Sequence, residues 1–242
     1  MSTRRNIPQR KQTVRPAQGA NDGISDEIVN IVEVKEHAQD FYVKHQKLIL
    51  SVVTGLVLLI GGYLAYKYAY VEPKEKAAIE AMYQAEAQFA RDSFASALDN
   101  PGGGAEGFAS IAENYGGTKA GNTAKLYAGI CQLNLGKYEE AIEYLEDYSP
   151  GDEVTPSVKY GALGDATAEM GDLEKAADYY EKAANEGDDE FNAPFYLNKL
   201  GLLQFAQKKN EEAFKTFKNI VDKYPNSMEA REAEKFVARL EK

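Results

Sequence analysis

GICQLNLGKYEEAIEYL, residues 129–145, predicts two helices joined by a short turn. Gly129 and Ala141 are small, so two helices that cross at these positions can approach closely. Gly136 lies between them, where a turn with a positive φ costs glycine little. Bulky residues at the crossing would push the helices apart. The stretch therefore predicts a helical hairpin.

The hairpin recurs along the chain. Its pattern returns at an offset of 35 residues and again at an offset of 37. The recurring small residues are Gly129, Gly136, Ala141, Gly164, Gly171, Ala176, Gly201 and Ala213. A partial unit precedes the full ones, because Phe108, Ile111 and Tyr115 match Phe217, Ile220 and Tyr224 at an offset of 109. Repeats of this length predict an all-α solenoid. We expect about four hairpins within residues 73–242, closed by the polar helix SMEAREAEKFVARLEK. Pro73 and the alanines that follow it predict that the first helix continues to about Leu98.

A charge-free segment precedes the repeats. Residues 48–66 read LILSVVTGLVLLIGGYLAY, and as a helix they would extend roughly 28 Å, close to the thickness of a bilayer core. The alternatives are a buried helix of a soluble protein and a cleaved signal peptide, but 47 residues precede the run and no A-x-A cleavage site follows it. We expect a transmembrane helix over 48–70, a helical lead-in over 26–47 and a disordered basic tail over 1–25.

Charge predicts the orientation of this helix. The first 20 residues carry five basic and no acidic side chains, whereas residues 71–242 carry a net charge of −13. Basic residues are retained in the cytoplasm, so we expect a cytoplasmic amino terminus and a periplasmic repeat domain.

Composition argues against several classes of function. The net charge of −10 leaves no large basic surface for nucleic acid. Cys131 is the single cysteine, and His37 and His45 are the two histidines, so the chain offers neither a disulfide nor a usual metal-ligand set. We expect no cofactor, no metal and no catalytic activity.

The repeats resemble the tetratricopeptide repeat family over residues 120–226. Matching motif positions are Leu163, Gly164, Ala176, Tyr180 and Ala183 in one unit, and Leu200, Gly201, Ala213, Phe217 and Pro225 in the next. The resemblance implies a concave groove that binds partner proteins. Its inward-facing positions map onto Leu126, Ile130, Leu133, Phe195, Leu202 and Phe205. The alternative for these residues is packing against a neighbouring repeat.

The predicted membrane helix carries small residues at steps of four and seven. They are Ser51, Gly55, Gly62 and Ala69. Such a stripe can let another membrane helix approach closely, although glycine is also tolerated in membrane helices generally.

The lead-in EVKEHAQDFYVKHQK (33–47), the anchor and the repeats together resemble the YfgM family of bacterial inner-membrane proteins. Residues 113–145 resemble the form found in Bacteroidetes. The resemblance implies an accessory subunit of the SecYEG translocon, with the membrane-anchored, prolyl-isomerase-like chaperone PpiD and emerging secreted chains as partners. The alternative function is a generic cell-envelope scaffold for another assembly complex.

Overall fold

The computed structural model describes residues 22–152, 154–186 and 190–241. Helices and their connections make up these residues, and there is no strand among them, as the sequence predicted. The chain divides into two compact units, which meet between Leu64 and Ala65.

In the described residues, the first unit is helix α1 (Asp22–Tyr66) as far as Leu64. Its backbone is helical through both the predicted lead-in and the apolar segment. Residues 22–25, which were predicted to belong to the disordered tail, are helical as well, and residues 1–21 of that tail lie outside the described residues. Within the described part of the chain, one helical run, Phe41–Phe89, is long and apolar enough to cross a membrane. The most apolar part of this run is not buried in the structure. Its side chains are therefore not covered by the rest of the described chain.

The second unit begins with the last two residues of α1, which are followed by a π-helical turn, η1 (Lys67–Val71), and by α2 (Glu72–Phe89). The alanine-rich pattern predicted that this helix continues to about Leu98, and that prediction is wrong. The chain reverses after α2, with Asp92 at a φ of 56°, before α3 (Phe94–Asp99) begins. The rings of Phe89 and Phe94 meet across the reversal, so the break lets both aromatic residues pack on one core.

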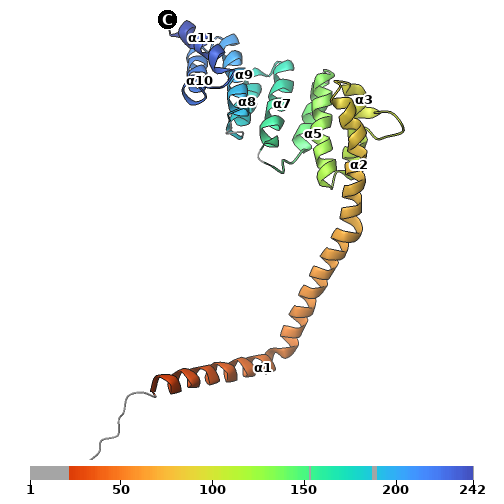
Figure 1. The fold of residues 1–242 in the computed structure, drawn as a ribbon, viewed down its shortest axis with the longest axis vertical. Coiled ribbons are helices and arrows are strands. Elements are labelled where there is room, and N and C mark those ends of the chain that lie inside the picture. Colours follow the sequence, from red (N-terminus) through yellow and green to blue (C-terminus); the bar gives the residue numbers. More distant parts are fainter. Residues whose placement is uncertain (1–21, 153, 187–189, 242) are drawn as a thin grey trace, which may run out of the picture. The chain divides into compact units, whose positions relative to one another are not determined.

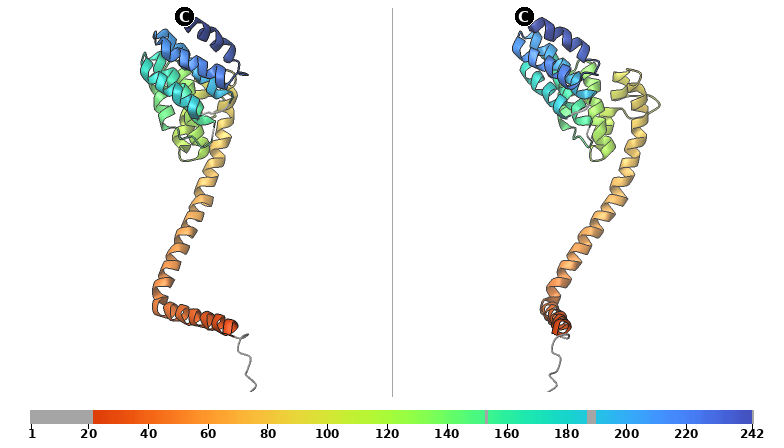
Figure 2. Two further views of the ribbon diagram at one scale, coloured as in Figure 1. Left: turned by 90° about the vertical axis from the view of Figure 1, so that its left-hand side faces the viewer. Right: turned by 60° about the vertical axis from the view of Figure 1, so that its left-hand side comes forward.

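The remaining helices form the repeats. They are α4 (Phe108–Tyr115), α5 (Lys119–Asn134), α6 (Tyr138–Asp147), α7 (Thr155–Glu169), α8 (Leu173–Glu186), α9 (Asn192–Ala206), α10 (Asn210–Lys223) and α11 (Ala230–Leu240). Figure 1 and Figure 2 show them stacked in chain order. Three full hairpins, α5–α6, α7–α8 and α9–α10, correspond to the three full units that the sequence predicted. The earlier partial unit ends in α4, whose Phe108 and Ile111 are buried as completely as Phe217 and Ile220 in α10.

The small residues of each hairpin lie at its close crossing. Gly129, Gly164 and Gly201 face Leu145, Tyr180 and Phe217, and an added Cβ would lie 2.6, 2.6 and 2.8 Å from these side chains. The matching alanines Ala141, Ala176 and Ala213 are fully buried one turn before each partner. Each unit thus packs a large side chain against a bare backbone.

The turn within each hairpin needs a left-handed residue. Gly136 and Gly171 adopt φ values of 74° and 84° at this position in the first two hairpins, and Lys208 adopts 63° in the third. A lysine pays a steric penalty there that glycine avoids.

We expect Lys208→Gly to raise the free energy of unfolding by about 0.5–1 kcal/mol, because relief of this strain exceeds the entropy that glycine adds to the unfolded chain. Lys208 is exposed, so no packing is lost. Urea unfolding monitored by circular dichroism measures the change. Gly171→Ala is the matched control and should be destabilising; a shift of both variants in the same direction would contradict the account.

Candidate binding groove

The first helices of the three full hairpins line one open hollow of about 670 Å³. Its wall comes from α5, α7 and α9, with one residue each from α6 and α8. The lining residues are Ile130, Leu133, Asn134, Tyr138, Val158, Ala162, Asp165, Ala168, Glu169, Tyr180, Phe195, Tyr196 and Lys199.

The repeat register explains why these residues meet. Val158 and Phe195 are 37 residues apart and so hold the same position in α7 and α9. Ile130 and Asp165 are 35 residues apart and share a position in α5 and α7. Because each unit repeats the last, equivalent positions of successive first helices point into one groove.

A polar cluster crosses the groove between α7 and α9. The Nζ of Lys199 lies 2.6 and 2.8 Å from the two carboxylate oxygens of Asp165. The hydroxyl of Tyr180 donates to the same carboxylate at 2.7 Å. The Lys199 ammonium also lies 5.1 Å from the ring centre of Phe195. The cluster joins two successive repeats at the floor of the groove.

Tyr180 donates a hydrogen bond within this cluster, and Tyr196 lines the same hollow. Burial, reinforced by the Asp165 carboxylate, raises the pKa of Tyr180 far above its ordinary value and that of Tyr196 to about 12. Both hydroxyls, which are protonated at physiological pH as in any tyrosine, therefore also stay protonated at alkaline pH. The neutral Tyr180 hydroxyl beside the Asp165 carboxylate, which is paired with Lys199, can stabilise this part of the groove and take part in the recognition of a bound segment.

Apolar side chains make up the rest of the wall. Ile130, Leu133 and Val158 are half-buried against the core between α5 and α7. Phe195 leaves 44% of its surface exposed in the same hollow. An open surface that combines apolar side chains with a few oriented polar groups suits a segment of another protein.

The structure separates the predicted groove residues into two groups. Ile130, Leu133 and Phe195 line the hollow. Leu126 is only 6% exposed and belongs to the core around Leu145. Leu202 and Phe205 lie outside this hollow.

Phe205 contacts the carboxyl-terminal helix instead. Its ring meets that of Phe236 in α11 at 5.3 Å between centroids. It is half-buried there, in the core that α9 shares with α10 and α11.

Residues of α7 were missed by the sequence prediction, although their register could have identified them. Asp165 and Ala168 stand 35 residues after Ile130 and Leu133, at positions already assigned to the groove. Neither residue is large and apolar, so hydrophobicity alone does not assign them to the groove.

The four small residues that were predicted to let another membrane helix approach lie in two different helical elements. Ser51, Gly55 and Gly62 lie in α1, where the Ser51 hydroxyl donates to the carbonyl of Leu48 at 2.8 Å. An added Cβ at Gly55 or Gly62 would meet no atom within 4 Å. Ala69 lies in the π-helical turn that follows α1.

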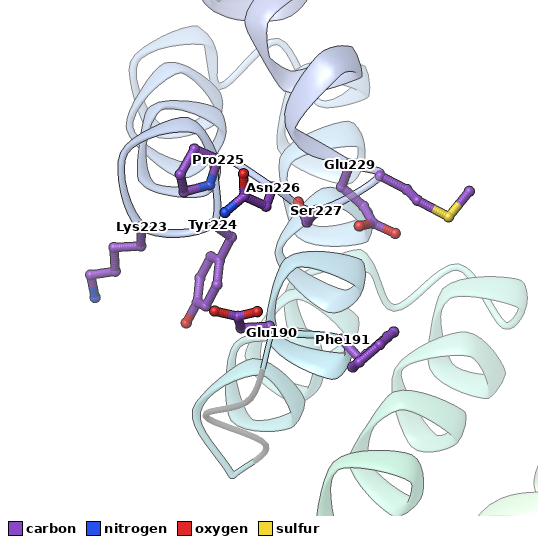
Figure 3. A pocket seen from close by; sticks show the side chains of 9 residues that line it. Glu190, Phe191, Lys223, Tyr224, Pro225, Asn226, Ser227 and Glu229 are labelled. Atoms are coloured by element: carbon purple, nitrogen blue, oxygen red, sulfur yellow. The ribbon is translucent and has the colours of Figure 1, made fainter.

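A smaller hollow of about 190 Å³ lies between two loops outside the groove. Figure 3 shows Tyr224 and Glu190 pointing toward one another across it, while Lys223 points away. Its lining comes from the end of α10 and from the connections before α9 and α11.

The described residues offer little that could bind a metal ion or act as a reactive thiol. No cluster of three or more His, Cys, Asp or Glu residues that could hold a metal ion occurs among them. Cys131 is fully buried in the core. Burial, together with the charge of Asp99, raises the pKa of its thiol to about 12, so it remains protonated.

A family model described as tetratricopeptide repeat matches residues 123–148 and 199–227. The first match covers most of α5 and α6, and the second covers the end of α9 and all of α10. No curated protein matches the chain. The match supports a tetratricopeptide-repeat protein, and such repeats indicate a protein–protein interaction module.

Proposed function

We propose that this chain is a non-catalytic, membrane-anchored binding protein whose groove holds a segment of a partner protein. The observation that carries this proposal is the hollow formed by equivalent positions of α5, α7 and α9. Three successive units contribute to one surface, so the surface is long enough to follow an extended or helical segment.

The membrane anchor determines where in the cell the groove can bind a partner. The unburied apolar residues of α1 are best covered by lipid, which would tether the repeat domain close to a bilayer. We further propose that the amino terminus is cytoplasmic and that the repeats are periplasmic, because the basic residues precede the span and the acidic domain follows it.

For the partner, we propose a SecYEG-type translocon in the bacterial inner membrane. The repeats would hold a PpiD-like membrane-anchored chaperone or emerging secreted chains at the periplasmic exit. This assignment rests on the resemblance of the lead-in, anchor and repeats to the YfgM family. The small residues Ser51, Gly55 and Gly62 would let α1 pack against a translocon helix.

Purification of the full chain from its native membrane in mild detergent, followed by mass spectrometry, tests this function. We expect translocon subunits and a membrane-anchored chaperone to co-purify. Gly55→Leu with Gly62→Leu should reduce recovery of the translocon subunits at least fivefold without reducing membrane insertion. Recovery of an unrelated envelope complex would overturn the translocon assignment and favour the scaffold function.

A further inference from the structure

Helix α11 takes the place of the first helix of a fourth unit. Ala193 and Ala230, 37 residues apart, are both buried. Tyr196 and Ala233 repeat this relation and share one core with α10. Figure 2 shows α11, in dark blue, at the end of the stack of repeats. The register of α5, α7 and α9 therefore continues into α11.

The groove positions of this register form a surface of their own on α11. Phe195 and Lys199, which line the groove on α9, correspond to Glu232 and Phe236 on α11. These two residues border an open hollow of about 410 Å³, whose lining is Met228, Arg231, Glu232, Lys235, Phe236 and Arg239.

This surface is joined to α9 through aromatic contacts. Phe236 stacks on Phe217 with 4.5 Å between ring centroids and also meets Phe205. The guanidinium carbon of Arg239 lies 4.9 Å from the centre of the Phe205 ring. Phe205, at the end of α9, therefore contacts this surface of α11.

Three basic residues and one acidic residue, Glu232, line this surface, so its net charge is opposite to that of the domain. Arg231, Lys235 and Arg239 follow at steps of four, so they share one face of α11, and all three are exposed. Within the described residues, none of the three forms an ion pair. They form a basic stripe on a domain of net charge −13, and like charges at this spacing repel one another.

We propose that this basic stripe binds an acidic segment of the partner protein that occupies the groove. The inference rests on the proposed function and names the chemistry of the segment. Arg231 to Arg239 extends about 12 Å along the helix, which about four residues of an extended chain would cover. The segment therefore carries two or three carboxylates within about four residues.

A protein segment suits this surface better than a larger polyanion. The 32 acidic residues of 71–242 would repel a nucleic acid or an anionic bilayer over most of the domain. A short acidic segment meets only the local charge of the stripe. Phe236 and Met228 offer apolar contacts beside the cations, which a peptide side chain can use.

Fluorescence anisotropy of labelled octaglutamate with the full chain in neutral detergent tests the stripe directly. We expect saturable binding that weakens at least tenfold between 50 and 300 mM NaCl. Arg231→Gln with Lys235→Gln and Arg239→Gln should weaken binding at least tenfold. The matched control is Lys215→Gln with Lys218→Gln and Lys223→Gln on α10, which removes the same charge and should change binding less than twofold.

Three results would overturn the inference. They are no binding of octaglutamate, equal loss in the α10 control, and displacement of octaglutamate by phosphatidylglycerol vesicles or oligouridylate at lower concentrations than by unlabelled octaglutamate. Circular dichroism melting verifies that both triple variants fold.

Partner recovery from membranes separates this inference from the proposed function. The triple glutamine variant of α11 should lower partner recovery at least fivefold. If the groove variant Val158→Thr with Phe195→Ser abolishes recovery while the triple variant leaves it unchanged, the stripe inference is wrong and the proposed function stands. If the groove variant also leaves recovery unchanged, the proposed function fails.

Discussion

Gly201→Leu is expected to lower the free energy of unfolding by about 3 kcal/mol, because the new side chain must enter space that Phe217 already fills. Even a Cβ at this position would lie 2.8 Å from the Phe217 ring, and the ring is fully buried. Gly164→Leu should cost about as much, since Tyr180 is equally rigid and its hydroxyl is held by Asp165. Urea unfolding of the full chain in detergent, followed by circular dichroism at 222 nm, measures both effects.

Two comparisons identify the cause of this loss. Gly129→Leu should cost less than either variant, because its neighbour is the flexible side chain of Leu145. Gly117→Ala should change stability by less than about 0.5 kcal/mol, because an added Cβ there meets no atom within 4 Å. Equal losses at Gly201 and Gly117 would contradict the close-crossing explanation.

Val158→Thr with Phe195→Ser is expected to reduce partner recovery from membranes at least tenfold. Both side chains line the groove, and the substitutions make two of its apolar contacts polar. Val154→Thr with Phe191→Ser is the matched control, because it makes the same two chemical changes at exposed positions outside the groove. An equal loss of partner recovery in the control would show that the groove is not the binding surface.

Folding must be separated from binding in this experiment. The groove variant should melt within a few degrees of the unmodified chain. Leu126→Asp provides the contrast: its side chain is buried in the core, so an unpaired carboxylate there should cost about 3 kcal/mol or more. Loss of binding without loss of stability is the result that defines a groove residue.

The repeat architecture could be predicted from the sequence because its signal is spread over many positions. Gly129, Gly164 and Gly201 carry the same constraint in each hairpin, and each constraint is local to two helices. The break after Phe89 could not be predicted in this way. Its cause is the packing of Phe89 and Phe94 on a distant core, and residues 90–93 contain neither glycine nor proline.

The groove was predicted only in part, for a related physical reason. Hydrophobicity identifies residues that avoid water, but Leu126 does so in the core and Phe195 does so at the surface. Asp165 was missed because the groove uses its charge to hold Lys199 and Tyr180. Register, rather than polarity, determines which side chains face the groove, and the same register places α11 as a fourth first helix.

Photo-crosslinking in cells tests the central claim most directly. A photoreactive residue is placed at Val158 or Phe195 in the groove, and at Glu140, which is exposed on α6 outside the hollow. The account predicts strong adducts to the same partner protein from both groove positions and little adduct from position 140. Strong adducts from position 140, with none from positions 158 and 195, would contradict it.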